Sequence, residues 1–181
     1  MDRYEPLRRR TIALVGLMGV GKSSVGRRLA SALSLPFRDA DAEVEAAAGR
    51  SIADIFAALG EPAFRDGERR VIARLLEGEP HVRATGGGAF MNDQTRALIK
   101  EKAVSVWLKG DLEVLARRVS RKGDRPLVAD KDPLEVLRAQ AAVRDPVYAE
   151  ADITVETGET PHQVAVEAIL DALRDHLKDA A

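Results

Sequence analysis

Residues 16–23 have the types and spacing needed to bind the phosphates of a nucleotide. They read GLMGVGKS and match the pattern G-x-x-x-x-G-K-[ST]. The glycines let the backbone turn and point its N–H groups at an anion, and a helix that begins after the loop adds its positive dipole end. Lys22 can then pair with the β- and γ-phosphates, and the Ser23 hydroxyl can ligate Mg²⁺. An ordinary glycine-rich turn with a solvated lysine is the alternative.

The sequence on either side of this loop favours phosphate binding. The apolar run TIALV at 11–15 precedes it, and Val25, Leu29 and Leu33 follow it with the spacing of one helix face. A strand, a glycine-rich loop and a helix in that order are the context that the pattern requires. We therefore expect a bound nucleotide, although the loop alone does not identify the group that accepts its phosphoryl.

Two carboxylates lie at the end of a second predicted strand at 36–39, because Asp39 is its last residue and Asp41 comes two residues later. In open parallel sheets, ligands bind outside the carboxyl ends of the strands, so both side chains can face the phosphates. One carboxylate could hold a Mg²⁺-bound water, and the other could accept a proton from a substrate hydroxyl. The simpler alternatives are a helix N-cap for Asp41 and a solvated strand end for Asp39.

Three consecutive glycines, Gly86, Gly87 and Gly88, follow the predicted strand at 82–85. Glycines cost backbone entropy on folding, so an ordered triplet needs a physical reason. Close approach of the backbone to a ligand is one reason, and a tight turn before a helix that begins near Asn92 is the other. The position after a strand favours the ligand.

Several arginines are candidates for binding an anionic substrate, although most arginines of a chain are solvated. Arg65 stands out because Glu68 lies one helical turn further on and can hold its guanidinium in place. The remaining candidates are Arg118, Arg125 and Arg144. Arg125 lies in a polar stretch at 120–131 whose composition fits a mobile flap and a plain surface loop equally well.

The elements that must position these residues form an alternating pattern. Short apolar segments are separated by stretches with helical spacing, which is typical of an α/β fold with a parallel sheet covered on both faces. Gly49 and Ser51 mark the end of one predicted helix and the start of the next, while Asp132 and Thr160 each precede a proline at the start of another. The predicted strands are 11–15, 36–39, 82–85, 104–108 and 153–155.

Composition limits the function classes. The 181 residues fit one domain, and 28 basic against 29 acidic residues give a net charge of −1, which indicates neither a nucleic-acid nor a membrane partner. The absence of cysteine excludes disulfides and thiolate chemistry. No segment is apolar and long enough to act as a signal peptide or to span a bilayer, so we expect a cytoplasmic protein. The three histidines form no pattern, and no role is predicted for them.

In order and spacing, these residues closely resemble the shikimate kinase family, from about Thr11 to the last helix. Ser24 stands where the family often has Thr, and both residues carry a hydroxyl. The segments that carry the resemblance are GLMGVGKS at 16–23, FRDAD at 37–41, GRSIADIF at 49–56, GE at 60–61, FR at 64–65, Glu68, TGGG at 85–88, RPL at 125–127 and Arg144 with Tyr148.

The resemblance implies a three-layer α/β P-loop kinase fold, with a five-stranded parallel sheet flanked by helices and a small lid. The whole chain, 1–181, would form a single domain with its core at 11–178 and the lid at about 120–133. The implied activity is ATP- and Mg²⁺-dependent phosphorylation of the 3-hydroxyl of shikimate in aromatic amino-acid biosynthesis, by a monomer.

The resemblance also implies roles for individual residues. Asp41 would bind the shikimate hydroxyls and act as the base, and Ser23 would ligate Mg²⁺ with Asp39 acting through water. The implied catalytic residues are Lys22, Asp41 and Arg125. The implied shikimate-binding residues are Asp41, Arg65, Gly87, Gly88 and Arg144, and the implied ATP-binding residues are Gly19, Val20, Gly21, Lys22, Ser23, Ser24, Arg118 and Arg125.

Two other function classes are weighed against this one. A related small-molecule kinase, such as a gluconate kinase, would share the loop and the fold, but Arg65, Arg144 and the glycine triplet favour shikimate. A GTP switch should carry an Asn-Lys-x-Asp motif, which is absent. An inactive kinase relative would be expected to lack Lys22, Asp41 or Arg125, and all three are present.

Overall fold

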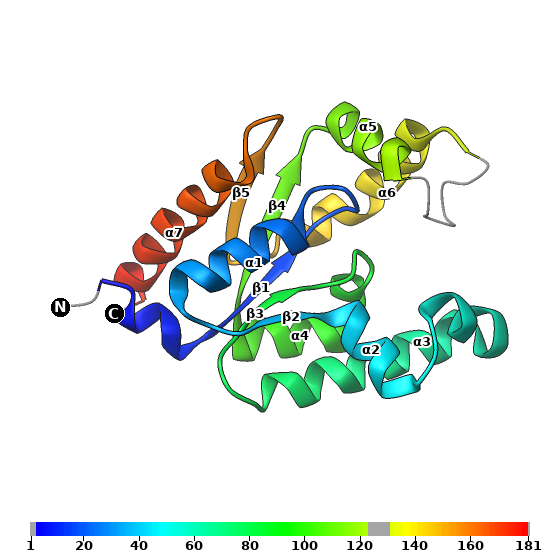
Figure 1. The fold of residues 1–181 in the computed structure, drawn as a ribbon, viewed down its shortest axis with the longest axis horizontal. Coiled ribbons are helices and arrows are strands. Elements are labelled where there is room, and N and C mark those ends of the chain that lie inside the picture. The colour runs from blue at the N-terminus through cyan, green and yellow to red at the C-terminus, as the bar shows by residue number, and fades with distance from the viewer. Residues whose placement is uncertain (1–2, 123–130, 181) are drawn as a thin grey trace.

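The fold is built on a parallel sheet. The computed structural model describes residues 3–122 and 131–180. Within them, five strands pair in the order β2-β3-β1-β4-β5, and every pair is parallel (Figure 1). This confirms the predicted α/β fold. The strands are β1 (Thr11–Val15), β2 (Phe37–Asp39), β3 (Val82–Ala84), β4 (Ala103–Gly110) and β5 (Ile153–Thr157).

The central strands are buried on both faces. Every residue of β1 is buried, as are the first six residues of β4, whereas buried and exposed residues alternate at the start of the edge strand β5. This is the burial expected where helices cover both sides of a parallel sheet. The register aligns Leu14 of β1 and Asp39 of β2 with Ala84 of β3, so three strands end at one level.

Helices cover both faces of this sheet. In Figure 1, α1 (Lys22–Leu33) and α7 (His162–Asp179) lie in front of it and α4 (Asp93–Lys102) lies behind, beside α3 (Ile52–Leu76). A short 3₁₀ helix, η1 (Glu5–Arg9), precedes β1 and contacts α7. The Arg8 Nε donates a hydrogen bond of 2.7 Å to the carbonyl oxygen of Leu33, which joins η1 to the end of α1.

The helices α2 (Ala40–Ala48) and α3 project from the sheet beside the ends of β2 and β3 (Figure 1). Gly49 ends α2 with a left-handed conformation, φ 65°, and the Ser51 hydroxyl accepts a hydrogen bond from the Asp54 N–H, so both predicted signals are confirmed. The residue that caps α2 is Asp39, because its side chain accepts from the N–H groups that follow; the cap considered for Asp41 is wrong. Gly60, with φ 82° and ψ 171°, divides α3 into two arms.

The remaining helices begin at caps that the sequence either predicted or missed. Asn92 caps α4 by accepting a hydrogen bond of 3.0 Å from the Thr95 N–H, and Asp132 caps α6 as predicted. The cap predicted at Thr160 is wrong, because α7 begins one residue later with Pro161 at the N-cap and no side-chain bond there. The other elements are η2 (Ala89–Met91), α5 (Leu112–Lys122) and α6 (Pro133–Tyr148).

Residues 123–130, most of the predicted lid, lie outside the described residues, and so does Arg125. None of the helices in the described part of the chain is long and apolar enough to cross a membrane.

The Asn92 cap should contribute measurably to stability. Asn92→Ala is expected to lower the free energy of unfolding by about 1 kcal/mol, because the N–H of the buried residue Thr95 loses its acceptor at the start of α4. Urea denaturation measures this difference. Asn92→Asp keeps an acceptor and should recover most of the loss, and Ser120→Ala, on the exposed side of α5, serves as the control. Equal stability of the Ala and Asp variants would contradict the assignment.

Candidate functional site

The phosphate-binding loop connects β1 to α1. Gly19 and Gly21 have φ values of 81° and 98°, which L side chains rarely adopt, so glycine is required at both positions. The Lys22 Nζ folds back over the loop and donates to the carbonyl oxygens of Gly16 and Leu17, at 2.6 and 3.0 Å. Val20 has a buried side chain, so it can offer a ligand only its backbone.

The Asp39 carboxylate joins this loop to the neighbouring strand. Its Oδ1 accepts from the N–H groups of Asp41 and Ala42 at 3.0 and 3.2 Å, which fixes its orientation. Its Oδ2 accepts a hydrogen bond of 3.1 Å from the Ser23 hydroxyl. A hydroxyl and a carboxylate held this close are hard oxygen donors of the kind that Mg²⁺ takes alongside water and substrate phosphates. Among the described residues no group of three or more His, Cys, Asp or Glu side chains could hold a metal by itself.

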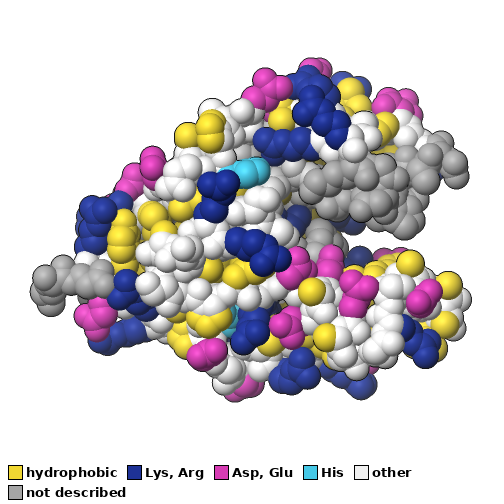
Figure 2. All heavy atoms as spheres, viewed as in Figure 1, with side chains coloured by type: hydrophobic (Ala, Val, Ile, Leu, Met, Phe, Trp, Pro, Cys, Tyr) yellow, Lys and Arg dark blue, Asp and Glu magenta, His cyan; other side chains and the backbone are white. Residues whose placement is uncertain are grey.

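A cleft of about 400 Å³ lies over the ends of β1, β2 and β3. Figure 2 shows the surface hollowed between the α2–α3 projection and the part of the molecule that carries α5 and α6. The cleft therefore brings together the phosphate loop, the two carboxylates and the first two glycines of the triplet, which are far apart in the sequence. Gly88, Arg65 and Arg144 are not among its lining residues. Its lining residues are Met18, Gly19, Gly21, Lys22, Ser23, Ser24, Asp39, Asp41, Ala84, Thr85, Gly86, Gly87, Arg118, Arg121 and His162.

The glycine triplet lies directly against the charged side chains. A Cβ on Gly86 would lie 2.9 Å from the Asp41 Oδ1, and a Cβ on Gly88 would lie only 2.3 Å from the Arg65 Nη2. A Cβ on Gly87 would lie 3.0 Å from the Arg144 Nη1. None of the three has a φ in the left-handed region, so the triplet is needed for space and not for backbone conformation.

Tyr148 holds the glycine loop at 86–88 from the protein interior. Its hydroxyl donates a hydrogen bond of 2.5 Å to the carbonyl oxygen of Gly87, and its ring is fully buried between Trp107 and Phe90. Burial raises the pKa of Tyr148 to about 12, so the phenol stays protonated and keeps donating. Tyr148 thereby holds the glycine loop beside Arg144, one helical turn earlier in α6.

Glu68 holds Arg65 in place, as the spacing predicts. The Arg65 Nη1 donates to the Glu68 Oε1 at 2.8 Å, while the Glu68 side chain is 2% exposed. Its Oε2 has no hydrogen-bond partner among the described residues, and it lies 3.2 Å from the position of a Cβ on Gly86. Burial raises the pKa of Glu68 above its ordinary value of 4.5; Arg65 opposes this shift, and the charge of Asp41 adds to it.

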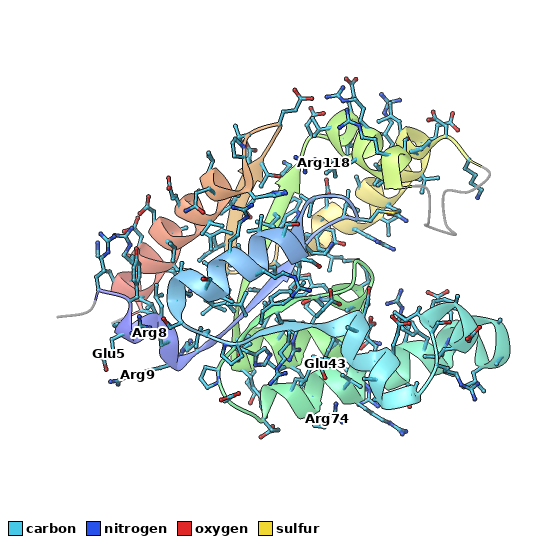
Figure 3. All side chains as sticks on the ribbon, in the orientation of Figure 1. Glu5, Arg8, Arg9, Glu43, Arg74 and Arg118 are labelled. Atoms are coloured by element: carbon cyan, nitrogen blue, oxygen red, sulfur yellow. The ribbon has the colours of Figure 1, made fainter. Side chains whose placement is uncertain are left out.

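Arg118 lies at the other end of the cleft. From α5 it donates to the carbonyl oxygen of Gly19 at 3.2 Å and to that of Gly158 at 2.9 Å, and Figure 3 labels it beside the phosphate loop. It therefore bridges the phosphate loop and the loop after β5. A planar guanidinium here can stack on an aromatic base.

Two further residues line the cleft, and one of them, His162, gave no signal in the sequence. His162, at the start of α7, lies so close to the phosphate loop that a Cβ on Gly21 would be 3.0 Å from its Cε1. The Thr85 Oγ1 is buried without a hydrogen-bond partner in the described structure. The contact of His162 depends on how α7 packs against α1, and no local pattern around His162 could have indicated it. Thr85, by contrast, is the first residue of the TGGG segment at 85–88 that carries the family resemblance.

Comparison with known proteins identifies the family. The model of the shikimate kinase family matches residues 18–174. A shikimate kinase of Caulobacter vibrioides is 75% identical over 173 residues, which covers 96% of this chain and 86% of that protein. The chain belongs to the shikimate kinase family. A shikimate kinase of Bradyrhizobium diazoefficiens is 54% identical and covers 97% of this chain and 85% of its own length.

Solved structures agree with this assignment. The shikimate kinase of Acinetobacter baumannii, solved in complex with shikimate, has a TM-score of 0.88 and 35% identity, covering 94% of this chain and 96% of that one. A gluconokinase of Sinorhizobium meliloti has a TM-score of 0.60 at 23% identity, covering 96% and 98%, which shows a shared fold alone. The family and the fold predicted from the sequence are therefore confirmed.

Glu68→Gln should change how stability depends on pH. Because burial raises the pKa of Glu68 above 4.5, the folded protein keeps this proton to a higher pH than the unfolded chain does. Its contribution to the free energy of unfolding is therefore present below pH 4.5 and falls as the pH rises through the folded-state pKa. Urea denaturation at a series of pH values should show the wild type losing stability relative to Glu68→Gln across this window.

The matched control is Glu61→Gln, since Glu61 also lies near Arg65, at 3.7 Å, but is 64% exposed. It should leave the pH dependence of stability as in the wild type. Parallel curves for the wild type and Glu68→Gln would contradict the raised pKa of Glu68.

Proposed function

We propose that this chain transfers the γ-phosphoryl group of ATP to the 3-hydroxyl of shikimate, giving shikimate 3-phosphate and ADP. The observation that carries the proposal is the single cleft that joins a phosphate-binding loop to Asp41 and to a glycine loop bordered by Arg65 and Arg144. The end of the cleft at the phosphate-binding loop suits a nucleoside triphosphate, and the end at the glycine triplet suits a small hydroxylated carboxylate.

The donor would lie along the loop at 16–23. Its phosphates would accept from the backbone N–H groups of Gly19, Val20 and Gly21, and the Lys22 ammonium would neutralise charge at the β- and γ-phosphates. Ser24 would contact the phosphates from the first turn of α1, and Arg118 would lie against the adenine. Arg125, outside the described residues, belongs to this proposal as the lid residue that would reach the transferring phosphoryl.

Mg²⁺ would be held at Ser23 and Asp39. The hydroxyl would be a direct ligand, and the carboxylate would act through a bound water. When bound, the ion supplies charge neutralisation at the phosphate oxygens during transfer. The hydrogen bonds that the Asp39 Oδ1 accepts from the start of α2 would keep the Oδ2, which faces Ser23, aimed at this position.

The acceptor would lie beside the glycine triplet. Guanidinium groups bind carboxylates with paired, charge-assisted hydrogen bonds, so Arg65 and Arg144 would hold the shikimate carboxylate. The backbone of Gly87 and Gly88 would lie against the ring, because no side chain separates it from the cleft. Asp41 would accept hydrogen bonds from the shikimate hydroxyls.

The transfer needs positioning and one proton acceptor. As the 3-hydroxyl oxygen forms its bond to the γ-phosphorus, its proton would pass to Asp41, and the bond between the γ-phosphorus and the bridging oxygen breaks to release ADP. Closure of the segment at about 120–133 as a lid would exclude water, which otherwise competes as an acceptor. We further propose that the chain works as one cytoplasmic domain, as a monomer, with no nucleic-acid or membrane partner.

A direct assay tests the reaction. Purified protein with ATP, Mg²⁺ and shikimate should form ADP and shikimate 3-phosphate in equal amounts, and gluconate in place of shikimate should give no product above background. Lys22→Met should lower kcat by about 10²-fold or more, because the transition state loses a preorganised charge. ATP loss that does not depend on shikimate would overturn the proposal.

Arg65→Ala should separate the two halves of the cleft. Because it removes a charge-assisted contact to the substrate carboxylate, we expect the KM for shikimate to rise by about 10- to 100-fold while the KM for ATP stays unchanged. Gly88→Ala should change the same KM in the same direction, since its methyl group would displace the Arg65 guanidinium. Arg69→Ala, one turn away and paired with Asp66, is the control. An equal rise in both KM values for Arg65→Ala would contradict the role of Arg65.

A further inference from the structure

A second cleft, of about 530 Å³, lies between α2 and the two arms of α3. Val44, Ile55, Phe64 and Val71 form its floor, and they make up a hydrophobic cluster separate from the main core. A Cβ on Gly67 would meet nothing within 4 Å, which shows how open the space beside α3 is. We name this cleft the α2–α3 groove; its volume falls in the range of sites that bind small molecules.

The charged side chains that line the groove are all basic. Arg50, Arg70 and Arg74 contribute guanidinium groups, and no Asp or Glu is among its described lining residues. Arg50 and Arg74 form no ion pair with any described residue, whereas Arg70 pairs with Asp66 at 2.9 Å. Figure 3 labels Arg74 at the lower edge of the molecule, on the opposite side of α3 from the catalytic cleft. Since the whole chain is nearly neutral, this basic rim is a local feature.

Aromatic and apolar surface lies next to these charges. The rings of Phe56 and Phe64 lie 4.8 Å apart, and Phe56 is 39% exposed. Leu59, on the wall of the groove, is 62% exposed. Apolar surface with a few polar groups on its rim is typical of ligand sites, and an aromatic ring can stack on an aromatic pair.

We propose that the α2–α3 groove binds a small aromatic carboxylate. The ring would pack on Phe64 and the aliphatic floor, and the carboxylate would pair with Arg50 and Arg74, since a guanidinium binds a carboxylate through two parallel hydrogen bonds. A neutral aromatic compound would leave the basic rim unpaired. A purely hydrophilic anion would gain nothing from the apolar floor.

The groove is connected to the proposed acceptor site through two adjacent residues of α3, because Phe64 lines the groove and Arg65 lies against its ring. The guanidinium carbon of Arg65 lies 5.1 Å from the centre of the Phe64 ring, so a ligand packed on Phe64 touches the residue that supports Arg65. Arg65 is also held by Glu68 on the other side. A bound aromatic carboxylate would therefore change the affinity for the acceptor and leave the nucleotide end unaffected. This coupling, unlike the binding itself, rests on the proposed function.

Binding is tested by titrating ¹⁵N-labelled protein with 2-naphthoate and recording amide shifts. We expect the largest shifts at 44–50 and 55–74, and binding of 2-naphthamide about fivefold weaker, which corresponds to about 1 kcal/mol for a partly exposed ion pair. Arg50→Gln and Arg74→Gln should each weaken 2-naphthoate about fivefold. Gly67→Leu, whose side chain would enter the open groove, should abolish the shifts. Arg28→Gln, on the exposed face of α1, is the control.

Several results would overturn the proposal. These are shifts confined to 16–24 and 86–88, equal binding of the amide and the acid, or equal affinities of Arg74→Gln and Arg28→Gln. A dimer in solution that Gly67→Leu converts to a monomer would make a second copy the occupant. Circular dichroism and denaturation establish that each variant is folded.

The coupling is tested by steady-state kinetics with 2-naphthoate. The KM for shikimate should change at least threefold in the wild type and remain unchanged in Gly67→Leu, while the KM for ATP is constant in both. The same change in both proteins would place the effect in the catalytic cleft and overturn the coupling. If the chain did not phosphorylate shikimate at all, the proposed function would fail, while the amide shifts would still decide the binding.

Discussion

The hydrogen bonds of one carboxylate, Asp39, join the phosphate loop and α1 to the start of α2. One of its oxygens accepts from the first N–H groups of α2, and the other accepts from the Ser23 hydroxyl at the start of α1. The helix α2 follows β2 directly, and α1 follows β1 after the phosphate loop. The parallel register sets the ends of β1 and β2 at one level. If this carboxylate turned, α2 would lose its cap and Ser23 its acceptor. The placement of Asp41, two residues further on, depends on the same cap.

The glycine triplet follows a different physical constraint, which is space. The glycine triplet occupies ordinary backbone conformations, yet a methyl group on any of its members would meet Asp41, Arg65, Arg144 or Glu68 at 3.2 Å or less. The charged groups can therefore approach the loop closely, and Glu68 can stay buried beside Arg65. The raised pKa of Glu68 reflects this crowding, because burial and the nearby Asp41 both disfavour its charged form.

The sequence predicted what depends on local chemistry. The phosphate loop, all five strands, the end of α2 at Gly49 and the Arg65–Glu68 pair each follow from residues that are close along the chain, and the structure confirms them. The roles assigned to the individual site residues remain predictions. The cap predicted at Thr160 and the cap considered as an alternative for Asp41 were both wrong, because Pro161 occupies the N-cap of α7 and Asp39 caps α2. His162 could not be found, since its place beside Gly21 depends on how α7 packs against α1.

The aromatic packing under the glycine loop has an optical consequence. Trp107 is the one tryptophan of the chain; it is buried in β4, and its ring centre lies 5.8 Å from that of Tyr148. Tyr148 is in turn hydrogen-bonded to Gly87, so the indole is only one side chain away from the glycine loop that lines the cleft. Displacements of that loop alter the surroundings of a single fluorophore. The intrinsic fluorescence of Trp107 therefore reports on the conformation of the cleft without an attached label.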